Sequence, residues 1–438
     1  MLKKIQAIAG IGLLGNKSLQ NFFFLAMIQA SNMLISLISM PLLVQSIGVD
    51  QFGLVNLALS VIMLANYLVD YGFSISGPRK VAIHQGDAKT LSIIYSEVLF
   101  TRLGMALGSS FLIIALIYGF GFFSGYQIIL LLSLVLLFSE ALLPLWFFQG
   151  MENLRWISLG NISGKLLFLL AIILFIHSPE QAKWVNFALG TSGLLINLLL
   201  FIYIRKALNI RVRLQSFVKY QKILVENSTL FFSNLTSYLS IKGGIFILSF
   251  FASASILGMY SVAERPIAVL RLLPSILIQS VFPRAAKLYQ EKSPTFFPYV
   301  RKSVILGVLG SLLVSIATFL TAPWIIGALT GNDLPLAIQF LKVMAWIPFL
   351  ASLNILHVII FFVKAENRLM MMTSIGMSMF MLLCSLVLLP QWDAIGMAYT
   401  LLLTEIFVFL LNTSINFVKN RSLIHGILQP STSRHHFG

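Results

Sequence analysis

Charged side chains are scarce in this chain. Only 10% of its 438 residues are Asp, Glu, Lys or Arg, and 58% are hydrophobic, whereas a typical soluble domain has about 25% charged and 45–50% apolar residues. The single cysteine, Cys384, excludes an intramolecular disulfide and a clustered-cysteine metal site. This composition is typical of an integral membrane protein and excludes a soluble enzyme or binding domain.

Motifs for enzymatic chemistry are also missing. The sequence has no Gly-x-x-x-x-Gly-Lys-Ser/Thr loop for nucleotide phosphates, no Asp-x-Asp pair for a metal-held sugar nucleotide and no His-Glu-x-x-His. It therefore shows no means of hydrolysing ATP. We expect a protein that is not an enzyme and that has no cofactor and no metal site.

Long apolar segments follow one another along most of the chain. A helix needs about 20 apolar residues to cross a bilayer. We predict an all-α polytopic membrane protein with twelve transmembrane helices, at 22–47, 53–77, 93–119, 126–149, 155–176, 184–204, 228–252, 256–282, 302–327, 336–363, 368–390 and 394–418.

The basic residues give an independent test of this topology. If the N-terminus is cytoplasmic, the predicted outer loops hold only Lys183 of the 30 Lys and Arg residues, and the remaining loop cations lie inside, as the positive-inside rule requires. Both termini are then cytoplasmic. The inner loops also explain the net charge of +16, so no nucleic-acid partner is needed. We expect residues 5–14 to form a retained surface helix and the tail after Gly426 to be loose.

The two halves of the chain repeat. Two similar runs, FFQGMEN at 147–153 and FFVKAEN at 361–367, lie in corresponding loops. Six helices in each half start the second half on the same side as the first, so the repeats are parallel and surround a central cavity. We predict an N-lobe at 1–222, which includes the basic linker, and a C-lobe at 223–438. Five further residues recur at an offset of 205: Gly53, Ala58, Ile62, Pro78 and Arg79 match Gly258, Ala263, Ile267, Pro283 and Arg284.

Several basic residues fall inside predicted spans, where an ionisable group costs a few kcal/mol and normally faces protein or water. Arg265 has no acid on its own helical face, so we expect its partner to come from another helix or from a substrate. Arg271 shares a face with Glu264, and the two either neutralise each other or bind a ligand. The candidate substrate-binding cations are Lys242, Arg265, Arg271, Lys165 and Arg102.

The deep acids are Glu140 and Glu405. Either of them carries a coupling proton, or it pairs with Lys165 or Lys242. Asp70 and Glu97 lie near the inner surface, where pairing with Arg79 or Lys80 is favoured. For His357 a hydrogen-bonded packing role is favoured over a relay. Gly104 and Gly108 form one Gly-x-x-x-Gly, for which close helix packing is expected.

Four segments form recognisable motifs: SIGVDQFGLVNLALSV (46–61) with the Pro78-Arg79 exit, PLWFFQGMENLRWIS (144–158), ILGMYSVAERPIAVLR (256–271) and VFPRAAKLY (281–289). Together they resemble the polysaccharide transporter family, the Wzx-type O-antigen flippases of the multidrug/oligosaccharidyl-lipid/polysaccharide superfamily. The resemblance extends from about Asn21 to Asn420.

This resemblance implies two six-helix lobes around a cationic cavity. It also implies that the chain moves undecaprenyl-pyrophosphate-linked oligosaccharide, such as an O-antigen repeat unit, across the bacterial cytoplasmic membrane. Arg and Lys in such a cavity suit a pyrophosphate. Glu264 and Arg265 match the family's Ala-Glu-Arg run, and Pro266 directly after it departs from the pattern. Implied partners are this substrate, membrane lipids, a polysaccharide polymerase and a chain-length regulator.

Two other functions stay open. A drug or cation antiporter of the same superfamily commonly has an acid in its first span, where this chain has Gln29, Asn32 and Gln45. A membrane polysaccharide polymerase or ligase needs a large outer loop with basic catalytic residues, and the predicted outer loops are short. The nature of the sugar is not legible from the sequence.

Overall fold

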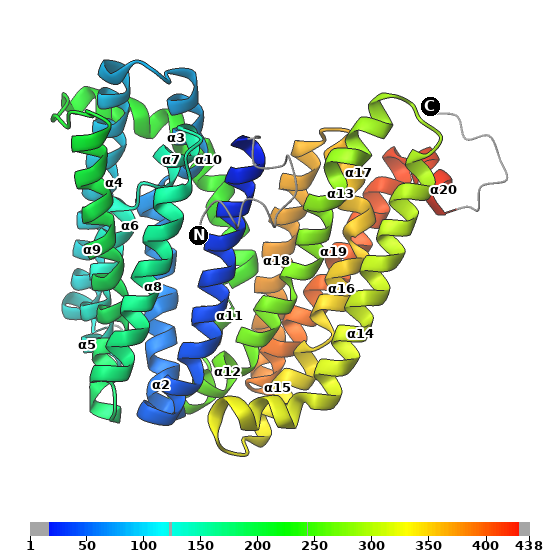
Figure 1. Cartoon of the computed structure of the whole chain (residues 1–438). Coiled ribbons are helices and arrows are strands. Elements are labelled where there is room, and N and C mark those ends of the chain that lie inside the picture. Colours follow the sequence, from blue (N-terminus) through cyan, green and yellow to red (C-terminus); the bar gives the residue numbers. More distant parts are fainter. Residues whose placement is uncertain (1–16, 122–124, 243, 429–438) are drawn as a thin grey trace, which may run out of the picture. The chain divides into compact units, whose positions relative to one another are not determined.

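The computed structural model describes residues 17–121, 125–242 and 244–428, and these are almost entirely helical (Figure 1). The helices form two compact units: unit 1 is Met1–Ser46 with Val61–Asn234, and unit 2 is Ile47–Ser60 with Leu235–Gly438. The predicted lobes, 1–222 and 223–438, differ from these units in two ways. The segment Ile47–Ser60 belongs to unit 2 although it lies in the first half of the chain, and the rest of unit 2 begins at Leu235 instead of at residue 223. The lobe boundary itself stays a prediction.

The first half of the chain supplies α2 to α10. Most of these helices lack a cap from a side chain, and their stability therefore depends on packing and on the low dielectric of the bilayer, where backbone groups must pair within the segment. The elements are α2 (Lys17–Asp70), α3 (Phe73–Ile83), α4 (Ala88–Phe120), α5 (Gln127–Ser133), α6 (Val135–Leu142), α7 (Leu145–Gly150), α8 (Arg155–Phe175), the 3-10 helix η2 (Pro179–Ala182), α9 (Lys183–Ala207) and α10 (Phe217–Lys242).

The second half supplies α11 to α20. They are α11 (Gly244–Leu248), α12 (Ala254–Leu270), α13 (Leu272–Gln290), α14 (Phe296–Thr330), α15 (Pro335–Met344), α16 (Ile347–Leu353), α17 (Ile355–Val363), α18 (Asn367–Trp392), α19 (Ile395–Lys419) and α20 (Arg421–Leu428).

Ten helical stretches of the described chain are long and apolar enough to cross a membrane. The prediction of an all-α polytopic membrane protein is confirmed. Nine of these stretches match predicted spans to within a few residues at most ends, and the tenth, Phe23–Ile83, covers the first two. The seventh predicted span contains residue 243, which lies outside the described residues, so the count of twelve stays a prediction.

α2 contains a sharp kink at Gly48. Its 54 residues would extend about 80 Å as one straight helix, far beyond a hydrocarbon core of about 30 Å. Gly48 has φ 79° and ψ 164°, a conformation that essentially only glycine adopts. The predicted outer loop at 48–52 is therefore replaced by this single residue, because one glycine is enough to break the helix direction.

The fourth and tenth predicted spans are both broken into three short helices. In unit 1 these are α5, α6 and α7, and in unit 2 they are α15, α16 and α17. Each broken span ends in a left-handed turn: Glu152 has φ 53° and Ala365 has φ 54°. The following amides, of Asn153 and Glu366, donate back to the carbonyls of Phe148 and Phe361 at 3.0 and 2.9 Å. Interrupted helices at corresponding places in two repeats are a marker of functional positions in transporters.

The core of unit 1 is built from the Trp-Phe-Phe-Gln-Gly run. Trp146 and Phe147 are buried and pack on the ring of Tyr95, with ring centroids 5.6 and 5.2 Å apart. Gly77 lies against Trp146, and a Cβ at Gly150 would lie 2.6 Å from the carbonyl oxygen of Pro78. These glycines bring α3 and α7 close together. The Trp-Phe-Phe-Gln-Gly run thus has a packing role in unit 1.

Two sequence expectations need separate comment. A Cβ built at Gly104 or Gly108 meets nothing within 4 Å among the described residues. The prediction that another helix of the chain packs closely against this Gly-x-x-x-Gly is therefore wrong. The predicted surface helix at 5–14 and the tail beyond Leu428 lie outside the described residues.

Candidate functional site

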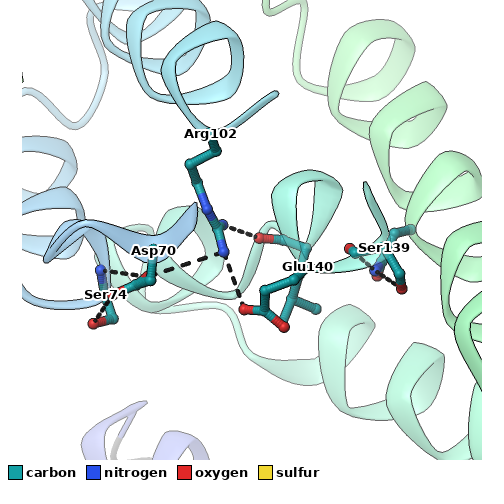
Figure 2. A network of polar contacts seen from close by, with 7 residues as sticks. Asp70, Ser74, Arg102, Ser139 and Glu140 are labelled. Carbon is teal, nitrogen blue, oxygen red and sulfur yellow. Dashed lines mark hydrogen bonds and ion pairs between the residues drawn. The ribbon is translucent and has the colours of Figure 1, made fainter. Parts of the chain in front are cut away.

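A buried charge cluster joins three helices of unit 1 (Figure 2). Arg102 of α4 is 2% exposed. Its Nη2 donates to Glu140 Oε1 of α6 at 3.0 Å and lies 3.9 Å from Asp70 Oδ1 at the end of α2, while its Nη1 donates to the carbonyl oxygen of Leu143 at 2.9 Å. One guanidinium therefore holds two carboxylates and a main-chain carbonyl together.

The local sequence explains why that carbonyl is available. Pro144 disfavours the helical conformation for the residue before it, and Leu143 accordingly has φ −64° and ψ 111°. α6 ends at this point, and the carbonyl of Leu143 points out of the helix instead of continuing the ladder. In a membrane such a group must find another donor. Arg102 supplies it, so the break in the fourth span and the buried arginine depend on each other.

Further polar contacts surround the cluster. Ser74 donates to Asp70 through its Oγ at 2.8 Å and its amide at 3.2 Å, and Asn197 of α9 donates to the carbonyl oxygen of Ser139 at 2.8 Å (Figure 2). Lys165 of α8 is half-buried and lies near enough to Glu140 for their charges to attract. Two acids and two cations thus balance, as buried charges require.

These contacts change the pairings expected from the sequence. Asp70 meets Arg102, whereas Lys80 forms a 3.0 Å salt bridge with Glu226, so the expected pair of Asp70 and Lys80 is wrong. Glu97 lies 3.9 Å from Lys219, a cation of the linker helix α10. The reason is topological: the first part of α10 lies within unit 1 and brings its own charges to the ends of the spans that carry Lys80 and Glu97.

A second ion pair lies in unit 2. Arg271 sits at the joint between α12 and α13, and its Nη2 contacts Oε1 of Glu405 on α19. The side chain of Glu405 is 6% exposed and that of Arg271 is 23% exposed. Glu140 and Glu405 thus each form a salt bridge with an arginine, which the sequence did not predict, and among the described side chains Lys165 forms no direct salt bridge with either acid. The carboxylate side chain of Glu405 is enclosed, while the arginine side chain is partly exposed.

Arg265 obtains its partners from the segment Ile47–Ser60. Its Nη2 donates to Asn56 Oδ1 at 2.8 Å, and its guanidinium lies 5.0 Å from the ring centroid of Phe52. A cation over an aromatic face is stabilised by the ring quadrupole. The expectation that a partner comes from another helix is confirmed. α12 runs through Pro266 without a break and ends only at Arg271.

Three further points concern residues or sites outside these clusters. The side chain of Lys242, the last residue of α10, lies outside the described residues. Within the described chain, no group of three His, Cys, Asp or Glu residues could hold a metal ion. A polar face of α19 was not predicted from the sequence: Asn412 and Asn416 are buried on it, as is Asn420 directly after its end. Their four-residue spacing, which places them on one helical face, was the available signal.

Solved structures share this fold. The chain superposes with a TM-score of 0.68 on a multidrug resistance MATE family transporter of the MOP superfamily in its inward-facing conformation, at 13% identity, covering 92% of this chain and all of that one. It superposes with a TM-score of 0.66 on the lipid II flippase MurJ, at 12% identity, covering 93% and 90%. At these identities the likeness shows the fold alone.

Sequence relatives cover nearly the whole chain. A "Putative O-antigen transporter" of Escherichia coli K12 is 22% identical over 408 residues, which are 92% of this chain and 97% of the relative. A protein of the same name from Shigella dysenteriae is 25% identical over 407 residues, 89% of this chain and 98% of the relative. The family model described as polysaccharide biosynthesis protein matches residues 18–289, more than half of the sequence, and the chain belongs to this family.

Proposed function

We propose that the chain is a flippase that moves an undecaprenyl-pyrophosphate-linked oligosaccharide, the repeat unit of an O-antigen or similar surface polysaccharide, across the bacterial cytoplasmic membrane. The full-length similarity to two proteins named as O-antigen transporters carries this proposal. The family match and the fold shared with a lipid II flippase support it. We further infer that transport proceeds without a covalent step on the substrate, that both termini are cytoplasmic and that a polysaccharide polymerase and chain-length regulator receive the product.

The described charges favour different roles for the five candidate cations. Arg265 and Arg271 combine positive charge with partial exposure, and the side chain of Arg271 is 23% exposed. We assign these two to the pyrophosphate, since arginine binds phosphate oxygens in a bidentate way. Lys165 and Lys242 remain candidates for the same role. Arg102 is enclosed by Glu140, Asp70 and Leu143, which favours a role in holding unit 1 together.

The test is transbilayer movement in proteoliposomes that contain a fluorescent undecaprenyl-pyrophosphate oligosaccharide. We expect the purified chain to expose the label to an impermeant quencher much faster than protein-free vesicles do. A fluorescent phosphatidylcholine is the control for unspecific scrambling. The proposal fails if both lipids move at the same rate, or if neither moves.

A multidrug antiporter is the second candidate, because MATE transporters share the fold. The first span, however, offers Gln29, Asn32 and Gln45 in place of an acid. Uptake of a cationic dye driven by a proton or sodium gradient in the same proteoliposomes, without movement of the lipid-linked oligosaccharide, would favour the antiporter.

A further inference from the structure

A line of buried polar side chains runs along α19 in unit 2. Asn412, Asn416 and Asn420 are 3%, 0% and 1% exposed, and they face Asn354 and His357 from the broken tenth span, which are 7% and 4% exposed. The Nδ2 of Asn412 donates to Oδ1 of Asn354 at 2.8 Å. Buried polar groups in a membrane span are costly and mark functional positions, yet none of these residues takes part in the clusters described above.

The hydrogen bonds of His357 define its protonation. Asn416 Nδ2 lies 3.4 Å from Nδ1 of the imidazole and also donates to the carbonyl of Asn412 at 3.1 Å. An amide NH₂ cannot accept, so Nδ1 carries a lone pair. The ring proton is then on Nε2, which donates to Thr413 Oγ1 at 3.0 Å, and that hydroxyl donates to the carbonyl of Phe409 at 2.7 Å. His357 is thus neutral in this arrangement, and both ring nitrogens are used.

The same donor-to-acceptor order of hydrogen bonds continues to the end of α19. Asn420 Nδ2 donates to Asn416 Oδ1 at 2.8 Å and to Glu366 Oε2 at 3.3 Å, and Asn420 Oδ1 accepts from Lys364 Nζ at 2.7 Å. An ammonium can only donate and an ionised carboxylate can only accept. The turn at Lys364–Glu366 therefore fixes the orientation of both amides, and through them the orientation of the amide that faces His357.

A proton on Nδ1 would reverse this order. It would point at the NH₂ of Asn416, and the conflict is removed when that amide turns over and presents Oδ1. Its NH₂ would then face the NH₂ of Asn420, which must turn in the same way. The NH₂ of Asn420 would next face the ammonium of Lys364, which cannot accept and must leave. One proton passes from water to the imidazole, and no other covalent bond changes.

We propose that His357 is a proton-binding site, and that Asn416 and Asn420 transmit its protonation to the Lys364–Glu366 turn. Burial opposes a charged imidazolium. The protonated ring therefore occurs in the state in which the turn is released, and the neutral ring occurs in the hydrogen-bonded state described here. The inference rests on the proposed transport function in one respect only: the binding of this proton would be coupled to transport. The coupling is mutual, because whatever opens the turn also favours proton uptake.

Charged groups on the helices around α17 set the surroundings of this site. Basic residues predominate there. On α13, α14, α18 and α19 they are Arg284, Lys287, Arg301, Lys302, Arg368 and Lys419, and the acids on α19 and in the turn are Glu405 and Glu366.

The test uses a nitroxide attached to Ala365→Cys, an exposed position in the turn, in a Cys384→Ala background. The mobility of the label is recorded at about pH 5.5 and about pH 8, on either side of the ordinary histidine pKa of about 6.5. We expect the mobile component to rise from a minority to a majority of the signal at the lower pH. Equal spectra at both pH values would overturn the proposal.

Three variants separate proton binding from mere packing. His357→Asn keeps an acceptor at the place of Nδ1 but cannot take the proton, so the turn should stay ordered at both pH values. Asn416→Asp accepts from a protonated Nδ1 and from Asn420 Nδ2 at once, without turning over, so the relay is broken and the turn should stay ordered at both pH values. Asn420→Ala leaves the histidine contacts intact and should give a mobile turn at both pH values.

These results are independent of transport. A pH response that persists in His357→Asn or in Asn416→Asp contradicts the assignment whether or not the chain moves a lipid. Conversely, the full set of expected spectra together with no movement of lipid-linked oligosaccharide would sink the proposed function and leave the proton site standing.

Discussion

Gly53 and Gly258, the two members of one repeat pair, pack directly against each other in unit 2. A Cβ at Gly53 would lie 2.5 Å from the backbone nitrogen of Gly258 and 2.2 Å from the carbonyl oxygen of Ala254, and a Cβ at Gly258 would lie 2.0 Å from the carbonyl oxygen of Val49. The segment Ile47–Ser60 and the start of α12 therefore approach at backbone contact. The repeat keeps glycine at both positions because neither helix has room for a side chain.

Alanine at either glycine should be strongly destabilising. The clash is with backbone atoms that cannot move away as a flexible side chain could, so we expect Gly53→Ala and Gly258→Ala each to cost about 3 kcal/mol or more. Gly104→Ala and Gly108→Ala are the matched controls, because their Cβ atoms meet nothing within 4 Å and alanine is the better helix former. Thermal unfolding in detergent should show a large loss for the first pair and none for the second.

Removal of Arg102 should damage unit 1 more than neutralisation of its partner does. Arg102→Ala removes the direct cationic partner of two partly exposed carboxylates and the donor to the Leu143 carbonyl, for an expected loss of about 3 kcal/mol. Glu140→Gln keeps an acceptor for the guanidinium and should cost less. The amount of folded protein in membranes and its melting temperature measure both effects. Equal, small losses would show that the cluster is not structural and would return Arg102 to the candidates for substrate binding.

The sequence was sufficient for the spans and insufficient for the pairings. Span positions depend on local hydrophobicity, which explains the agreement at most helices. Salt-bridge partners depend on tertiary packing: Arg102 and Glu140 are 38 positions apart, and Arg271 and Glu405 are 134 apart. Gly104 and Gly108 show the same limit, since a small-residue motif does not say which helical face meets a neighbour. A kink of one residue, such as that at Gly48, does not change the local composition, so the sequence predicts a loop there.

Asp87 should give a pH-dependent cap at the start of α4. Its carboxylate accepts from the side chain and amide of Thr90 and from the amide of Lys89, and these hydrogen bonds, that of the Thr90 side chain first, lower the pKa of Asp87 below its ordinary value. A lowered pKa in the folded state means that the cap stabilises the protein above the unfolded pKa of about 3.9. This contribution is lost as the pH falls through the lower folded value.

Asp87→Ala should therefore melt at a lower temperature than the parent at neutral pH, and the difference should shrink as the pH falls below about 4. Asp87→Asn should melt close to the parent at neutral pH, because asparagine also caps helices, without that pH dependence. A difference between parent and alanine variant that is constant with pH would mean that the charge of Asp87 does not contribute.

Membrane topology follows from the distribution of basic residues and can be tested at exposed loop positions. In a Cys384→Ala background, cysteine at Asn332 or Asp393 should react with an impermeant maleimide from outside, whereas cysteine at Lys89, Lys219 or Lys292 should react only after permeabilisation. All five positions are exposed in the structure, so burial does not explain a lack of reaction. Outside labelling at Lys219 would contradict the cytoplasmic placement of the linker and of both termini.

An exchange of the charges in the Arg271–Glu405 pair separates structural from substrate-binding roles of Arg271. Either single change, Arg271→Glu or Glu405→Arg, buries two like charges against each other and should reduce the amount of folded protein. The double variant restores the pair with reversed polarity and should recover the folded amount. If Arg271 also binds the pyrophosphate, the double variant should still fail to move lipid-linked oligosaccharide in proteoliposomes, because a carboxylate then occupies the more exposed position and repels the substrate. Recovery of both folding and transport would show that the pair is purely structural, and Arg265 would then be the remaining arginine assigned to the substrate.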